Sequence, residues 1–141
     1  MAATRTATAH WEGSLTEGAG KVSLDSSGLG THDVTWAART EEPNGKTSPE
    51  ELIAAAHSSC FSMALSNVLA KAGTPPQSLE TKADVTFVPG TGITGSHITV
   101  VGRVEGMSVE DFAAAAEDAR KNCPVSQALG GTEITLDASL A

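Results

Sequence analysis

The longest apolar stretch of the chain predicts one long helix over residues 48–72. Ser48 is a typical N-cap, Pro49 suits the first helical position, and Glu51 completes a Ser-x-x-Glu capping box. The helix should end before the Gly-Thr-Pro-Pro sequence at 73–76. Its apolar residues cover nearly every face, which is typical of a helix surrounded by other structure. A chain of 141 residues has little else to cover it, so we expect a second copy to do so in a homodimer.

Alternating patterns predict strands on both sides of this helix, and a second helix follows Ser108 at 109–121. Pro124 opens a short helical turn. The predicted strands cover residues 3–11, 21–25, 33–38, 78–88, 96–105 and 132–137, with a turn at 90–95 between the two longest and a loop at 41–46. The order of strands, helix, strands, helix and strand predicts an α+β fold with a mostly antiparallel sheet. The length predicts a single domain over residues 1–141.

Charge and composition exclude several classes of partner. The formal net charge is −8, whereas nucleic acids and anionic membrane surfaces require a basic face on the protein. No stretch approaches the ~20 apolar residues of a membrane span, and the N-terminus lacks the apolar region of a secretion signal. We therefore expect a cytoplasmic protein. In that compartment a cysteine pair is more often redox-active or metal-bound than structural.

The two cysteines, Cys60 and Cys123, are the strongest chemical signal. Cys60 lies inside the long predicted helix, and Cys123 directly precedes Pro124. One thiol could pass through thiolate, sulfenic acid and disulfide before an external thiol reduces it again. Cys123 would be the resolving thiol, because a thiolate at the start of a helical turn is stabilised and leaves more easily.

A reactive Cys60 would need a fixed cation, because an apolar setting raises the pKa of a thiol. Arg39 is expected on the loop just before the long helix and is the best placed of four arginines. Glu50 is the expected orienting carboxylate, since a carboxylate can hold a guanidinium bidentately. Glu50 and Cys60 are separated by roughly 15 Å along one helix. A Glu50 that serves this thiol must therefore come from the other subunit, which is a second reason to expect a dimer.

The residues alone leave other interpretations open. Cys60 could be an inert core thiol, or could form a structural disulfide with Cys123. His57 lies one helical turn before Cys60 and could be the general base of a cysteine hydrolase, or a metal ligand together with both cysteines. More often such a histidine is a packing residue with its hydrogen bonds satisfied. Trp11 and Trp36 could belong to a core or line a pocket.

Four segments resemble the peroxidases of the osmotically inducible protein C (OsmC) family. They are the first-cysteine helix at 47–65, the second-cysteine motif at 123–127, the N-terminal signature at 9–13 and the last strand at 133–137. The sister branch, the organic hydroperoxide resistance (Ohr) proteins, takes its arginine from the first hairpin. The corresponding segment here, residues 17–21, contains no arginine. Arg39 therefore fits the OsmC branch.

The resemblance implies an intertwined α+β homodimer with sheets wrapped around long central helices and active sites at the subunit interface. It implies reduction of organic hydroperoxides, and less well of hydrogen peroxide, with Cys60 peroxidatic and Cys123 resolving. Arg39 would be the activating arginine and Glu50 the orienting carboxylate. The family needs no metal or bound cofactor, and an external dithiol, such as a dihydrolipoyl group, supplies the electrons. The alternative is a redox-sensing or small-ligand-binding dimer without turnover.

Overall fold

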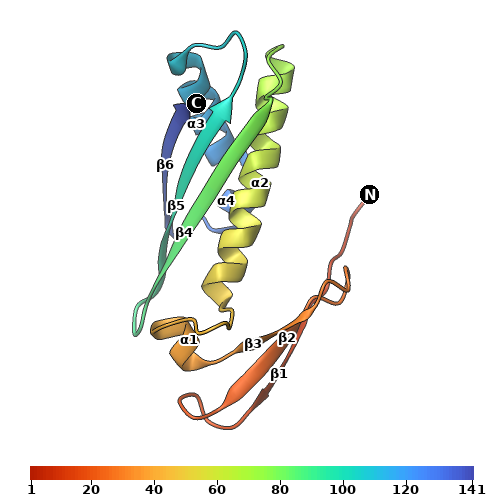
Figure 1. The fold of residues 1–141 in the computed structure, drawn as a ribbon, viewed down its shortest axis with the longest axis vertical. Helices are drawn as coiled ribbons and strands as arrows, with labels where there is room; N and C mark the ends of the chain where they lie inside the picture. The colour runs from red at the N-terminus through yellow and green to blue at the C-terminus, as the bar shows by residue number, and fades with distance from the viewer. The chain divides into compact units, whose positions relative to one another are not determined.

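The computed structural model describes residues 1–141 and combines helices with two three-stranded sheets, which confirms the predicted α+β class (Figure 1). The chain divides into two compact units, Met1–Leu52 and Ile53–Ala141. The boundary falls in the first turn of the longest helix. A single domain over the whole chain stays a prediction.

The first unit contains an antiparallel meander in which β2 is the central strand. Its strands are β1 (Thr8–Glu12), β2 (Ala19–Ser23) and β3 (Thr31–Val34). The first two predicted strands are confirmed, although β1 is shorter than expected and β2 begins and ends earlier. Gly20 pairs with Trp11, and a Cβ atom on Gly20 would lie 2.7 Å from the indole ring. Glycine is therefore required for the indole to pack there.

The prediction of a strand over 33–38 is wrong in its second half. Residues Trp36–Thr40 form the short helix α1. The hydroxyl of Thr35 accepts a hydrogen bond from the Ala38 N–H at 3.1 Å, which is the N-cap geometry of a helix. Arg39 therefore lies on a helix, and not on the loop that the sequence indicated. The following loop is confirmed, with positive φ at Asn44 (48°) and at Gly45 (78°).

The long helix α2 (Pro49–Lys71) begins and ends close to the predicted positions. The Ser48 hydroxyl accepts a hydrogen bond from the Glu51 N–H at 3.2 Å, while the Glu51 carboxylate accepts one from the Thr47 hydroxyl. At the other end Gly73 has a φ of 85°. The N–H of Thr74 then donates to the Leu69 carbonyl at 2.9 Å, as in a Schellman motif.

The second unit contains a mixed sheet in the order β4-β5-β6. Its strands are β4 (Ser78–Val88), β5 (Gly92–Arg103) and β6 (Glu133–Leu140); β4 and β5 are antiparallel, whereas β5 and β6 are parallel. Both sheets together are thus mostly antiparallel, as predicted. The turn before β5 is tighter than the predicted 90–95, and β6 extends further than expected. A parallel pair needs a crossover, which α3 (Val109–Asn122) and α4 (Pro124–Ala128) supply.

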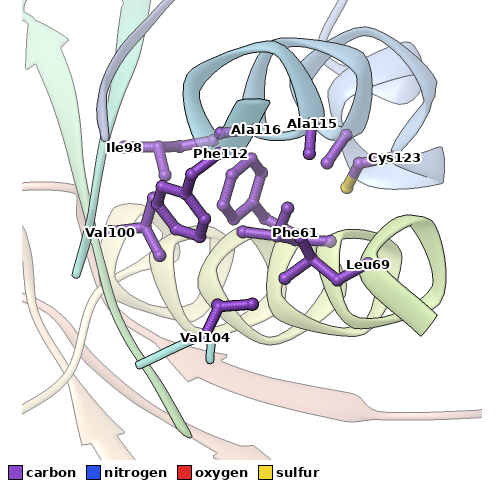
Figure 2. Packing of buried hydrophobic residues seen from close by; sticks show 11 residues of the cluster. Phe61, Leu69, Ile98, Val100, Val104, Phe112, Ala115, Ala116 and Cys123 are labelled. Atoms are coloured by element: carbon purple, nitrogen blue, oxygen red, sulfur yellow. The ribbon is translucent and has the colours of Figure 1, made fainter. Parts of the chain in front are cut away.

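The hydrophobic core lies where α2 and α3 pack on one face of this sheet (Figures 1 and 2). Its fully buried members are Phe61, Leu65, Leu69, Ile98, Val100, Phe112, Ala116, Ala119 and Cys123. Gly102 allows the close approach of α3, because a Cβ atom there would lie 2.6 Å from the Phe112 ring. Cys123 is therefore part of the core that holds α2 in place.

Much of α2 is not covered by the rest of the second unit. Met63 has 72% of its surface exposed, and 22% of the most apolar 18-residue window of α2 is buried. By length and hydropathy this helix could cross a membrane, so the expectation that no stretch approaches that limit is wrong on those two criteria. The core helix of a soluble protein meets the same criteria, and they are weak evidence for a span. The uncovered apolar surface agrees with the prediction that α2 needs a further covering layer.

Candidate active site with two thiols and an arginine–glutamate pair

The second unit brings the two cysteines into one cluster. Cys60 packs against the core from the middle of α2, and Cys123 is the N-cap residue of α4, as the sequence indicated. Both are free thiols; Cys60 is partly exposed and Cys123 is fully buried. A partly exposed thiol can meet a substrate from solvent, whereas a fully buried thiol cannot.

The ionisation of Cys60 is controlled by its immediate surroundings. Burial raises the pKa of the Cys60 thiol, a hydrogen bond from the Val125 backbone N–H lowers this pKa, and the adjacent Cys123 raises it. None of these influences comes from a cation. The second unit by itself therefore holds Cys60 largely as the thiol, and a thiolate nucleophile requires further stabilisation.

Arg39 and Glu50 form a bidentate ion pair in the first unit. The Arg39 Nε donates to Glu50 Oε1 at 3.0 Å, and Nη2 donates to Oε2 at 2.8 Å. The Glu50 side chain is 9% exposed and that of Arg39 is 27% exposed. The guanidinium also lies 5.9 Å from the centre of the Trp36 ring, within range of a cation–π contact. The predicted pairing is present, and the catalytic role of both residues stays a prediction.

An apolar cavity of about 290 Å³ lies next to this ion pair, also in the first unit. Arg39 forms part of its wall, and its apolar lining includes Trp11, Leu15, Trp36 and Leu52. Both tryptophans therefore line a pocket, which was one of the two alternatives for them. The Trp11 indole N–H donates to the Gly13 carbonyl at 3.0 Å, which fixes the ring at the wall.

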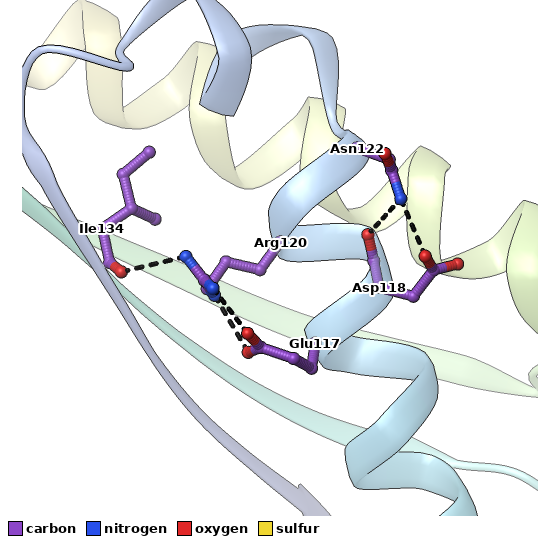
Figure 3. Close-up of polar contacts among 5 residues, drawn as sticks. All are labelled: Glu117, Asp118, Arg120, Asn122 and Ile134. Atoms are coloured by element: carbon purple, nitrogen blue, oxygen red, sulfur yellow. Dashed lines mark hydrogen bonds and ion pairs between the residues drawn. The ribbon is translucent and has the colours of Figure 1, made fainter.

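A second hollow, of about 680 Å³, opens beside Cys60 in the second unit. Met63 and Lys71 of α2 and Asn122 of α3 contribute to its lining. Figure 3 shows how polar contacts hold the end of α3. The Asn122 side chain donates to the Asp118 carboxylate at 2.7 Å.

Arg120 ties the same helix end to β6. Its guanidinium donates to the Glu117 carboxylate and, at 3.3 Å, to the Ile134 carbonyl (Figure 3). The Arg120 contact holds the pKa of the Glu117 carboxyl below its usual value. These contacts restrain the backbone that leads directly into Cys123.

His57 is fully buried between two serines that sequence reasoning did not identify. Its Nδ1 lies 2.6 Å from the Ser96 hydroxyl, and its Nε2 lies 2.8 Å from the Ser126 hydroxyl. Burial lowers the pKa of His57, which favours the neutral ring. Both ring nitrogens are thus engaged, so neither is available as a base for Cys60 or as a metal ligand. The sequence contained one signal of this contact. Ser96 lies two residues before Ile98 on β5, so both side chains face the core.

The chain is similar to known proteins of one family. Residues 42–139 match the family model described as OsmC-like protein. The chain is 43% identical over 135 residues to Peroxiredoxin OsmC of Escherichia coli (strain K12), covering 94% of this chain and 93% of the relative. The same identity and coverage hold for Peroxiredoxin OsmC of Shigella flexneri.

Solved structures share the fold at lower identity. An OsmC-like protein of unknown function from Vibrio cholerae has a TM-score of 0.75 at 17% identity, covering 97% of this chain and 99% of that one. The organic hydroperoxide resistance protein OhrB of Bacillus subtilis has a TM-score of 0.69 at 22% identity, covering 96% and 98%. Together with the family model and the 43% identity over nearly the whole length, this shows that the chain belongs to the OsmC family, in its OsmC branch.

Proposed function

We propose that this protein is a cysteine-based peroxidase that reduces organic hydroperoxides. The observation that carries the proposal is the pair of free thiols in one core, with Cys60 open to a hollow and Cys123 buried beside it. The Escherichia coli relative named a peroxiredoxin supports this activity at 43% identity.

The reaction would transfer two electrons from Cys60 to the peroxide. The Cys60 thiolate attacks the terminal oxygen of ROOH, the O–O bond breaks, and the alkoxide leaves as the alcohol after taking a proton. Cys60 becomes a sulfenic acid. The Cys123 sulfur then attacks the Cys60 sulfur, and hydroxide leaves as water when the disulfide forms. An external dithiol, for example a dihydrolipoyl group, reduces the disulfide and is itself oxidised.

We propose that Arg39, held by Glu50, supplies the cation that a Cys60 thiolate needs. A guanidinium near the thiolate would lower the Cys60 pKa and stabilise the developing alkoxide. Glu50 and Cys60 are roughly 15 Å apart along α2, so the Arg39–Glu50 pair that serves one Cys60 would belong to the partner subunit of a homodimer. The uncovered apolar surface of α2 supports such a dimer.

The substrate preference follows from the cavity beside Arg39. A space of about 290 Å³ lined by two tryptophans can hold an aryl or alkyl group, whereas hydrogen peroxide gains little from apolar walls. We therefore propose that the protein reduces organic hydroperoxides more efficiently than hydrogen peroxide. With a net charge of −8, we propose neither nucleic acid nor an anionic membrane as a partner, and we propose a cytoplasmic location.

The test is consumption of cumene hydroperoxide by the purified protein with excess dithiothreitol, compared with C60S and C123S. Turnover by the wild type, abolished in C60S and reduced in C123S, supports the peroxidase and both roles. A single oxidation without turnover supports the alternative, a redox-sensing or ligand-binding dimer. If both thiols survive peroxide, the cysteines are inert core residues and the proposal is wrong.

A further inference from the structure

Three elements of the second unit meet at the His57 ring. His57 comes from α2, Ser96 from β5 and Ser126 from α4. Their exposed fractions are 0%, 2% and 5%, so the two hydrogen bonds are shielded from water. A serine hydroxyl both donates and accepts, so either neutral tautomer of His57 satisfies both contacts. Breaking one contact would leave a buried polar atom without its partner, which makes the arrangement costly to disturb.

The two contacts of His57 have different consequences. Ser96 lies on β5, whose neighbouring residues Ile98 and Val100 are fully buried in the core. Ser126 lies in the single turn of α4 that starts at Cys123. The Gln127 N–H donates to the Cys123 carbonyl at 3.0 Å, so this turn is closed by its own backbone. The contact through Nε2 therefore acts on the segment that carries the second cysteine.

The same turn supplies both groups that act on Cys60. Cys123 is its N-cap, and the Val125 backbone N–H lowers the pKa of the Cys60 thiol. Ser126 follows Val125 directly. The hydrogen bond between His57 and Ser126 thus restrains the Val125 N–H and the Cys123 thiol together.

We propose that His57 is a positioning residue for disulfide formation, because its Nε2 contact with Ser126 holds the first turn of α4 in reach of Cys60. This inference rests on the proposed function, in which Cys123 attacks the oxidised Cys60. Disulfide formation needs the two Cα atoms within a narrow range of distance, and a small misplacement of a reacting group costs a large factor in rate. His57 does not touch the peroxide, so the first oxidation of Cys60 should depend on it less.

Matched substitutions separate this role from general packing. H57Q places an amide near the position of Nε2 and can keep the Ser126 contact, whereas H57N places it near Nδ1 and can keep only the Ser96 contact. S126A and S96A delete the same two contacts from the other side. If His57 merely stabilised the core, H57Q and H57N would slow disulfide formation equally, and so would S126A and S96A.

The experiment follows one oxidation of the full-length protein by cumene hydroperoxide, with dimedone present to trap the sulfenic acid. Mass spectrometry gives the fraction of Cys60 that is trapped and the fraction that reaches the Cys60–Cys123 disulfide. We expect disulfide formation about fivefold to tenfold slower in S126A and H57N, the factor typical of one lost hydrogen bond. S96A and H57Q should stay within about twofold of the wild type, and in S126A and H57N the rate of first oxidation should fall less than the rate of disulfide formation.

Other outcomes overturn the inference. If S126A closes the disulfide at the wild-type rate while the wild type cycles, His57 does not position the turn. If S96A and S126A are slowed equally, the histidine only stabilises the core. If the wild type itself forms no disulfide, the proposed function fails and this inference fails with it. Circular dichroism confirms folding, and S126A, which removes a single oxygen atom, remains informative should H57N not fold.

Discussion

The two units of the chain differ in what holds their chemical groups in place. In the second unit Cys60 and Cys123 belong to a dense core, and every buried residue of that core comes from residues after Leu52. In the first unit Ala38 is the only buried apolar side chain, yet the unit contains a shielded, bidentate ion pair. Packing positions the thiols, whereas directional charge-assisted hydrogen bonds position the arginine.

The groups that the proposed reaction needs are also divided between the two units. The second unit has the proposed nucleophile, Cys60, but no cation that acts on it. The first unit has the cation and an apolar cavity but no cysteine. Neither unit by itself has all the groups that the proposed peroxidase would use, which is why we propose that a partner subunit completes the site. Substitutions that affect one unit and spare the other test this division.

The largest effect on activity is expected for Arg39. R39A should lower turnover of cumene hydroperoxide by about 10²–10³, the range found when an oxyanion-stabilising donor is removed. The Cys60 pKa, measured by the pH dependence of alkylation, should rise in the dimer. R39K retains the charge but not the planar fork, so it should recover only part of the activity. Full activity in R39A would show that the first unit supplies no catalytic group.

A large effect on stability is expected in the second unit alone. F112A should lower the free energy of unfolding by about 3–5 kcal/mol, because Phe112 is 1% exposed and fills the core next to Gly102. The control is L29A in the first unit, where Leu29 is 80% exposed and about 0.5 kcal/mol or less is expected. Urea denaturation measures both. Equal losses would mean that the two units do not differ in core packing.

An intermediate effect is expected on substrate choice. W36A enlarges the apolar cavity of the first unit and removes an aromatic wall. We expect the ratio of kcat/KM for cumene hydroperoxide to that for hydrogen peroxide to fall about tenfold, with most of the loss on the organic substrate. The matched control, L15A, removes a more exposed wall residue and should change the ratio less. An unchanged ratio in W36A would place substrate binding elsewhere.

The smallest effect concerns the pH dependence of stability. Burial lowers the pKa of His57, so below about pH 6.5 the unfolded chain binds a proton that the native ring resists. Stability that is present above this pH should decrease as the pH falls, with a slope of at most about 1.4 kcal/mol per pH unit. H57Q should have a flatter profile between pH 7 and 5. An equal slope in both proteins would show that His57 titrates normally.

Local signals in the sequence predicted much of the fold. The ends of α2 follow from Ser48, Pro49 and Gly73, which act on backbone groups only a few residues away. The sequence likewise predicted the strands of the β1–β2 hairpin, the helix α3 and the helical turn that follows Cys123. The short helix α1 was missed because Thr35 continues the alternation of a strand, and its role as an N-cap depends on the turn that follows.

What the sequence by itself determined is therefore the set of elements other than α1, the two thiols and the pairing of Arg39 with Glu50, since helical periods, caps and charge complementarity are local or simple in chemistry. Only the tertiary structure decided the parallel pairing of β5 with β6, the Val125 donor to Cys60, and the burial of His57 between Ser96 and Ser126. These contacts join residues far apart in the chain, and their partners are selected by how the core packs and not by any local pattern.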